Sequence, residues 1–408
     1  MTVDKLFQLI ESNSKTLQVK KTSVEFAEKS IEAAKSSRLP DIGVKASVSY
    51  NGDVLVSDRD FSDMEGFSAP HLGNSFALEA QQVVYAGGAV SAAIRMAELG
   101  KKQAEAGLTL TRQQQRFMAL GQFLDLYKLS KRKQVYEENI ATTKKLIENI
   151  EQKHQQGMAL RNDITRYELQ MESLRLGLRK LEDQQVILNH QLCNQLGLAS
   201  TTIVPVVETE LSNQGGNEAQ WQQTAVESSP LMEQSRLDIQ MADQELKMAR
   251  SEMLPKVAVF AADMLNGPFV YDLPPKDINV NNWYAGIGIQ YSLSSLFKSN
   301  KKVQRARLRT RQSNEQERAT AESLNNDMQQ VWTLYQQSYV ELDTQKKSVK
   351  LARQNYEVVN ERYLSQLALV TDMLDASNTL LNAELNEVDA RINIIYAYYR
   401  MKFISGTL

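Results

Sequence analysis

The sequence has little of what enzymes and metal proteins use for their chemistry. Its 408 residues include three histidines and a single cysteine, Cys193, so the chain has no internal disulfide and no cysteine cluster for a metal. The HExxH and GxSxG motifs and the glycine-rich phosphate loop are all absent. We therefore predict no enzyme activity, no catalytic residue, no cofactor and no metal site. Cys193 is expected to be a small packed residue.

An excess of charge of either sign is also missing. The chain has 47 basic and 49 acidic side chains, a net charge of −2 and an isoelectric point near 6.1. Nucleic-acid-binding domains generally carry a basic patch that raises the isoelectric point well above this value. We therefore expect no nucleic-acid partner.

Proline is scarce and unevenly placed. No proline occurs between Pro70 and Pro205, and none follows Pro275. Because proline breaks helix interiors, these two stretches allow very long helices. A continuous helix from Ala89 to His154 would measure about 100 Å, which is too long to pack inside a compact domain.

Two segments of the chain repeat. AEKSIEAAKSSRLP at 27–40 matches ADQELKMARSEMLP at 242–255, and GMALRNDI at 157–164 matches QLALVTDM at 366–373 with nearly the same offset. The sequence therefore predicts a first structural repeat at 1–200, a linker at 201–230 and a second repeat at 231–408. Each repeat is expected to run helix, strand pair, long helical hairpin.

Runs of about eighteen apolar residues are absent, which excludes a spanning helix but leaves open a barrel of alternating strands. Four segments are predicted to be such strands: DIGVKASVSY, SFALEAQQVVY, KVAVFAADM and WYAGIGIQYSL. The third alternates poorly. Apolar residues facing outward and small or polar residues facing inward suit a lipid-facing barrel. An exposed soluble sheet remains the alternative.

The predicted long helices carry narrow apolar seams. Leu342, Val349, Tyr356 and Tyr363 recur every seven residues, and similar spacings follow both hairpin turns. Most of the other helix positions are polar, so each helix is expected to touch neighbours laterally with water on both sides. This arrangement is typical of a helical tube wall. Two hairpins are too few to close a tube, so several copies are required.

The stretch from Arg362 to Leu408, with its TDMLDA segment, resembles the C-terminal part of TolC-type outer-membrane efflux proteins. The duplication and the Leu-Pro-strand junctions extend the resemblance over essentially the whole chain. It implies a mainly α fold with a β-barrel portion. Each of three subunits would give four strands to a shared outer-membrane barrel and two long hairpins to a periplasmic α-helical tunnel.

The resemblance also implies a function and partners. The homotrimer would be the exit duct of a tripartite efflux pump or type I secretion system, in contact with outer-membrane lipid. A periplasmic adaptor (membrane fusion protein) and an inner-membrane RND or ABC transporter would complete the assembly. The N-terminus MTVDKLFQLIES lacks a secretory signal, so we expect the sequence to begin after signal cleavage or with an added start methionine.

Three candidate sites follow at the hairpin turns. By resemblance, the adaptor docks on the apolar turn residues Gly157, Met158, Ala159, Leu160, Gln366, Leu367, Ala368 and Leu369. Asp372 and Asp375 stand three residues apart, and the same resemblance implies that they form a cation-selective ring, although helix N-terminal acids stabilised by the dipole are an alternative.

The third candidate is a gate formed by Asp163 and Tyr363, which would meet when the two hairpins stand side by side. The family's best-known member has an arginine after its second turn, where this chain has Ala368. Arg161 is the candidate replacement for that cation, with a solvated arginine as the alternative. We expect a gate in a similar position but differently connected.

Two other functions fit part of the pattern. A periplasmic adaptor would carry one hairpin with flanking β-rich domains, whereas this chain has two hairpins and no such domains. A soluble coiled-coil scaffold explains the heptads but leaves the four alternating strands without a role.

Overall fold

The computed structural model describes residues 1–199, 216–269 and 271–408, and they form two compact units. Unit 1 comprises Met1–Ser23, Glu105–Ser235 and Glu317–Leu408, and unit 2 comprises Val24–Ala104 and Arg236–Gln316. Residues 201–215 of the predicted linker lie outside the described residues. The remainder of that linker includes the helix α5 (Glu218–Ser228).

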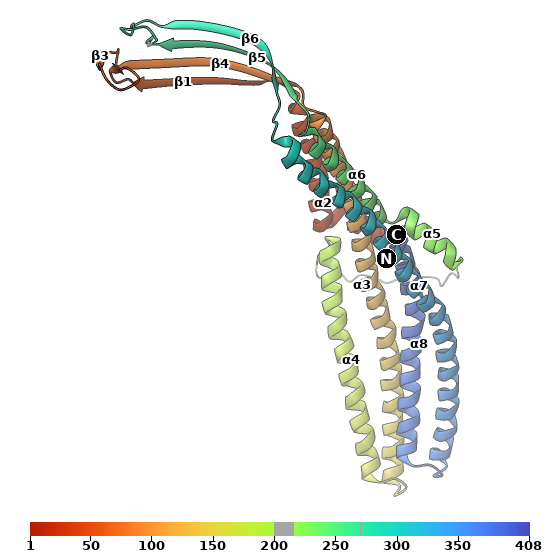
Figure 1. Ribbon diagram of the computed structural model, residues 1–408. Helices are drawn as coiled ribbons and strands as arrows, with labels where there is room; N and C mark the ends of the chain where they lie inside the picture. Colours follow the sequence, from red (N-terminus) through yellow and green to blue (C-terminus); the bar gives the residue numbers. More distant parts are fainter. Residues whose placement is uncertain (200–215, 270) are drawn as a thin grey trace. The chain divides into compact units, whose positions relative to one another are not determined.

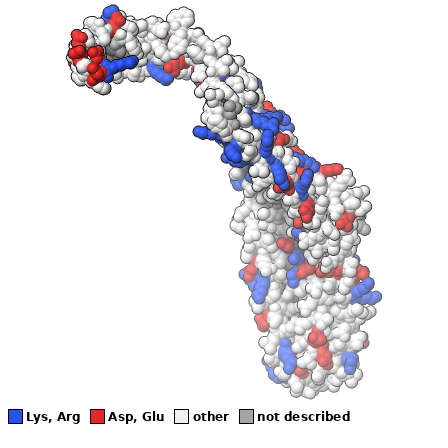
Figure 2. Space-filling view, in the orientation of Figure 1, with Lys and Arg blue, Asp and Glu red and all other residues white. Residues whose placement is uncertain are grey.

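Unit 2 holds the strands (Figure 1). Its four main strands form one antiparallel sheet in the order β1-β4-β5-β6, and they are β1 (Asp41–Tyr50), β4 (Leu72–Tyr85), β5 (Lys256–Gly267) and β6 (Val280–Gln290). All four predicted strands are thus confirmed. Along the chain, a short hairpin of β2 (Val54–Val56) and β3 (Glu65–Phe67) connects β1 to β4, and it was not predicted. Figure 2 shows acidic side chains gathered at this end of the sheet.

The register explains why the third strand alternates poorly. Asp263 pairs with Leu78 and with Trp283, so this carboxylate lies on the same face as the apolar side chains of its neighbours. The Asn281 amide donates a hydrogen bond to Asp263 at 2.9 Å. On the opposite face, Phe260 lies over Gly286, where an added Cβ would come within 3.0 Å of the ring. The aromatic ring therefore occupies the polar face because a glycine beside it leaves room.

The helices are long, as their lack of proline predicts. They are α1 (Val3–Asn13), α2 (Lys15–Ser36), α3 (Ala89–Gln155), α4 (Arg161–Leu196), α6 (Pro230–Ser251), α7 (Ser295–Leu364) and α8 (Val370–Ile404). The predicted helix from Ala89 ends one residue later than expected. The helices α2 and α6 end at equivalent positions, since Ser36 and Ser251 stand at the same place before the Leu-Pro pair of each repeat. None of the helices in the described ranges combines the length and the apolar character that crossing a bilayer would need.

The core of unit 1 follows the predicted seams. One cluster joins α1, α3, α4 and α8 through Leu6, Leu120, Phe123, Leu192 and Ile392, all of them buried. Cys193 is buried in the same cluster, as predicted, and burial raises the pKa of its thiol. A second cluster packs Met328, Val331 and Tyr335 of α7 against α8. These narrow contacts hold the hairpins together along their length.

Candidate functional site at the two hairpin turns

The two hairpin turns have the same backbone structure. In the turn between α3 and α4, the Met158 N–H donates to the Lys153 carbonyl oxygen at 2.8 Å, and between α7 and α8 the Leu367 N–H donates to the Arg362 oxygen at 2.8 Å. In both turns the residue before this donor is left-handed, Gly157 at φ +75° and Gln366 at φ +64°. This is the Schellman ending of a helix, which favours glycine at the left-handed position. The second turn therefore carries a glutamine where the first has the preferred residue.

An aspartate begins the helix after each turn. The Leu160 N–H donates to Asp163 Oδ2 at 3.0 Å, and the Leu369 N–H donates to Asp372 Oδ2 at 2.9 Å. Each carboxylate thus satisfies a backbone donor that the helix itself leaves open, and its charge lies at the positive end of the helix dipole. Asp372 therefore makes the helix-capping contact that was the alternative to a selectivity ring. Asp375, one turn further along α8, is exposed.

The turns lie over a cluster that contains side chains from all four long helices. Its buried members are Leu146, Ile150, Ile164, Tyr167, Tyr363, Val370 and Met373, with Ala159 and Ala368 packed against it. The other apolar residues of the turns point outward. Met158 is 50% exposed and Leu367 is 70% exposed, as are Leu160 and Leu369. The predicted docking segment is thus divided into inward alanines and outward large side chains.

Lys153, which no sequence pattern indicated as a site residue, lies beside the predicted gate residue Tyr363. Its ammonium group is 5.2 Å from the centre of the Tyr363 ring, and its Nζ donates to the Leu364 carbonyl oxygen at 3.4 Å. A lysine in the last turn of a helix is ordinary, and nothing local in the sequence indicates that it reaches the other hairpin. Arg161, the predicted cation, is exposed and makes no ion pair within the described residues.

The electrostatics of this cluster keep its phenols protonated. Burial raises the pKa of Tyr363, and the nearby Asp163 carboxylate raises it further. Burial is also the main cause that raises the pKa of Tyr167, with smaller contributions from Tyr363, Tyr356 and Asp163. In the described part of the chain, Asp163 hydrogen-bonds to the Leu160 amide and not to the Tyr363 hydroxyl. Asp163 and Tyr363 are close enough to interact electrostatically, and the gate itself stays a prediction.

Polar contacts continue the link between the hairpins away from the turns. The Gln170 amide of α4 donates to Asn378 of α8 at 2.7 Å, and the Asn139 amide of α3 donates to Glu384 of α8 at 3.4 Å. The described residues contain no group of three or more His, Cys, Asp or Glu side chains placed to hold a metal ion. The site at the turns therefore consists of packed apolar side chains and charged groups at the end of a helical bundle.

Comparison with known proteins gives consistent matches. A family model described as "Outer membrane efflux protein" matches residues 6–198 and 221–407. No curated protein sequence matches the chain. Among solved structures, the outer membrane protein VceC of Vibrio cholerae matches with a TM-score of 0.83 at 17% identity, covering 99% of this chain and 96% of that one.

Two other channels match over a similar extent. The CmeC outer membrane channel of Campylobacter jejuni gives a TM-score of 0.81 at 15% identity, covering 99% of this chain and 85% of that one. The open state of the MtrE outer membrane channel of Neisseria gonorrhoeae gives 0.71 at 13% identity, covering 99% and 88%. These matches confirm the predicted resemblance and the fold class, and the matching family is one of efflux proteins rather than enzymes. The chain belongs to the outer membrane efflux protein family.

Proposed function

We propose that three copies of this chain form an outer-membrane exit duct, which passes drugs or other exported substrates outward from a periplasmic adaptor and an inner-membrane RND or ABC transporter. The duct would serve a tripartite efflux pump or a type I secretion system. The observation that carries the proposal is a sheet with one apolar, exposed face and two open edges. We also propose that residues 1–200 and 231–408 are two copies of one structural unit, joined by 201–230.

The apolar face of the sheet is exposed to an unusual degree. Val44 of β1 is 78% exposed and Ile287 of β6 is 72% exposed, and Trp283 lies on the same face. An isolated soluble sheet would cover such a face, because contiguous apolar patches are costly in water. Lipid would cover it without any further protein. The strands have 10 to 14 residues, enough for tilted strands to cross a bilayer.

The opposite face of the sheet is polar. Lys45 and Glu79 form an ion pair across β1 and β4 at 2.6 Å, and the Ser75 hydroxyl donates to Asn266 at 2.6 Å. In a closed barrel this face would line the water-filled interior. Within the described strands, β1 pairs only with β4 and β6 only with β5. The ladder groups at these two edges would pair when neighbouring copies close the barrel.

The helices of unit 1 also have uncovered flanks. Large apolar side chains are exposed on α4, including Leu169 and Val186, and on α7, including Val340 and Leu351. When two different flanks of neighbouring copies meet head to tail, the copies form a ring if the rotation between them closes. A ring of hairpins would give the tube that the heptad seams indicate. The turn residues, with their outward Met158 and Leu367, would then lie at the end that receives the adaptor.

A planar-bilayer recording tests this proposal. The protein is extracted from outer membranes in detergent and added to a bilayer at symmetrical salt. The proposal predicts discrete single-channel steps that disappear when the protein is heat-dissociated before addition. Protein that is inserted and folded but gives no steps, even after the gate is weakened as described below, would refute the duct.

A further inference from the structure

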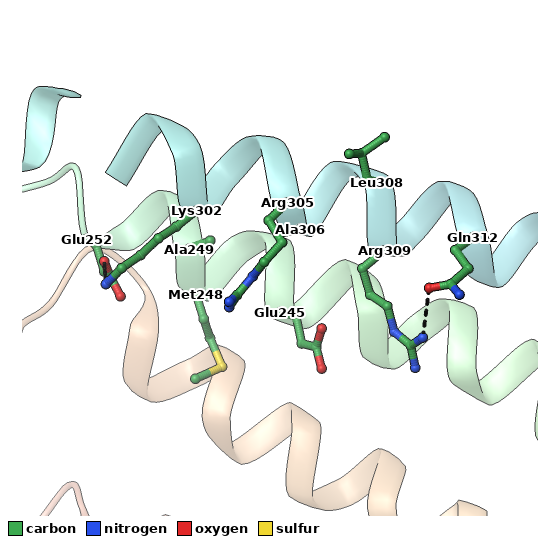
Figure 3. A pocket seen from close by; sticks show the side chains of 10 residues that line it. All are labelled: Glu245, Met248, Ala249, Glu252, Lys302, Arg305, Ala306, Leu308, Arg309 and Gln312. Carbon is green, nitrogen blue, oxygen red and sulfur yellow. Dashed lines mark hydrogen bonds and ion pairs between the residues drawn. The ribbon is translucent and has the colours of Figure 1, made fainter. Parts of the chain in front are cut away.

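A groove lies between α6 and α7 within unit 2. Its volume is about 780 Å³, and its walls carry Lys302, Arg305 and Arg309 from α7 and Glu245, Met248 and Glu252 from α6. Figure 3 shows the three cationic side chains extending from α7 across the face of α6. Ala249, Ala306 and Leu308 add apolar surface beside them.

A second hollow continues this groove toward the sheet. It has a volume of about 410 Å³, shares Glu252 and Lys302 with the first, and reaches Lys256 at the start of β5 and Gln290 at the end of β6. Four serines line it, Ser292, Ser294, Ser295 and Ser299, together with Lys298. The two hollows therefore form one path from the strand ends to the helices, which we name the α6–α7 groove.

The α6–α7 groove is electropositive. Five cations line it, Lys256, Lys298, Lys302, Arg305 and Arg309, against the carboxylates of Glu245 and Glu252. Lys302 pairs with Glu252 at 2.7 Å, and this hydrogen bond lowers the pKa of the Glu252 carboxyl. Arg309 bonds to the neutral Gln312 at 3.1 Å. Lys298 and Arg305 have no carboxylate partner within the described residues. Figure 2 shows basic side chains gathered over these helices.

The cations form one stripe along the helix. Lys298, Lys302, Arg305 and Arg309 follow one another at spacings of four, three and four residues, which places them on one face of α7. Arg307 and Arg311 lie on the opposite face. A solvated basic helix has no need of such alignment, and the stripe borders the apolar side chains of Met248 and Ala249. Cationic, hydroxyl and apolar groups are thus combined in one groove that begins at the strand ends.

We propose that the α6–α7 groove binds the headgroup of an anionic glycerophospholipid from the membrane leaflet next to the helices. The inference rests on the proposed function, because the sheet must span the bilayer for the strand ends to lie at its surface. Basic clusters directly beside a membrane-spanning segment attract anionic lipid headgroups, and the attraction fades within about 10 Å of the surface. The serine hydroxyls and Lys298 would hold the phosphate, and the apolar side chain of Leu254, in the wall nearest the sheet, would contact the lipid's glycerol and upper acyl chain. A soluble anion would gain nothing from that apolar wall.

Lipid selectivity measured on the assembled protein tests the proposal. The full chain is reconstituted into phosphatidylcholine nanodiscs, and its preference for spin-labelled phosphatidylglycerol over spin-labelled phosphatidylcholine is measured from the motionally restricted fraction. Two variants are compared, Lys298→Gln with Arg305→Gln in the groove, and Arg307→Gln with Arg311→Gln on the opposite face of the same helix. Both remove two exposed positive charges from the same stretch. Inorganic phosphate is titrated into a parallel sample.

The wild type is expected to prefer phosphatidylglycerol, and the groove variant is expected to lose this preference by about fivefold or more, since each cation near an anionic surface contributes on that order. The opposite-face variant keeps the preference, and millimolar phosphate leaves it unchanged. Equal loss in both variants, displacement by phosphate, or loss of the trimer in the groove variant alone would each overturn the proposal. Channel conductance is recorded from the same samples. Conductance without lipid preference defeats only the lipid site, whereas absent conductance defeats the duct.

Discussion

Lys153 of α3 places its ammonium group 5.2 Å from the centre of the Tyr363 ring of α7. The last helical turns of α3 and α7, which belong to different hairpins, are therefore in contact through a cation over an aromatic face. Such a contact is worth about 0.5–1 kcal/mol at a partly exposed site. The same ammonium group donates to the Leu364 carbonyl oxygen. Two weak contacts from one side chain therefore hold the hairpins together where the gate is proposed.

Removing this cation is predicted to loosen the end of the helical bundle. Lys153→Gln loses the cation–π contact, which shifts the closed-to-open equilibrium by a factor of about two to five toward opening. We expect a higher single-channel conductance or open probability in planar bilayers, and a further rise when Tyr363→Phe and Asp163→Ala are added. Lys145→Gln removes an exposed charge from the same helix and serves as the control. Conductance in Lys153→Gln that equals the control would show that this contact does not restrain the channel.

The proposed selectivity ring is best tested without disturbing the helix cap. Asp372 caps α8 through the Leu369 amide, so Asp372→Asn keeps a side-chain acceptor while removing the charge. The double variant with Asp375→Asn is predicted to lose most of the preference for cations in reversal-potential measurements across a salt gradient. Glu361→Gln, an exposed neutralisation on α7, is the comparison. If the double variant keeps the wild-type reversal potential, the two aspartates serve only the helix.

The left-handed Gln366 predicts a stabilising substitution. A non-glycine residue in this conformation costs about 1–2 kcal/mol, and part of the gain from Gln366→Gly is lost to the freer unfolded chain, which leaves about 0.5–1 kcal/mol. Hydrogen exchange of the turn amides between α7 and α8 should slow accordingly. The mirror substitution Gly157→Gln should speed exchange in the turn between α3 and α4 by a similar factor. Faster exchange in Gln366→Gly would mean that the glutamine side chain stabilises its turn.

The outward apolar residues of the turns are predicted to receive the adaptor. Met158→Glu with Leu367→Glu places two charges on exposed positions, so folding should be unaffected while apolar contact is lost. Site-specific cross-linking to an adaptor in cells is expected to fall at least tenfold with the trimer intact. Gln156→Glu adds a charge to the same turn without removing apolar surface and should keep the cross-link. Persistence of the cross-link in the double variant would place the adaptor contact elsewhere.

The two faces of the sheet should respond differently to arginine. Val44→Arg on β1 or Ile287→Arg on β6 puts a charge on the apolar face, which costs about 2–4 kcal/mol at the middle of a bilayer. Both are expected to lower the yield of trimer recovered from membranes. Ser47→Arg lies on the polar face of β1 and should be tolerated, since Lys45 already occupies that face. Equal yields from all three variants would contradict a lipid-facing sheet.

Much of the fold was predictable because its helices and strands follow simple local rules. The absence of proline, the heptad seam through Leu342 and Tyr363, and the alternation around Val44 each determine a local structure independently of the rest. The strand predicted after Pro255 is present despite its weak alternation. The register shows why its pattern is poor, because Asp263 lies on the apolar face and Phe260 on the polar face. The short β2–β3 hairpin has only three residues in each strand, too few for a periodic signal.

The site was less predictable than the fold. The positions of the two turns are local features and were predicted correctly, whereas a capping role was considered for Asp372 and not for Asp163. The contact of Lys153 with Tyr363 joins residues that lie in different halves of the chain, and it depends on how the two hairpins pack. The basic stripe from Lys298 to Arg309 is visible as a charge run, but its groove exists only because α6 packs beside it.

The central claim is that this chain acts as a trimer in a membrane, and the mass of the extracted complex tests it most directly. The protein is solubilised from outer membranes in a mild detergent and its mass is measured by native mass spectrometry before and after heating. The account predicts a complex of three copies that is extracted only with detergent and falls to single copies on heating. A monomer that leaves the membranes in detergent-free buffer would contradict it.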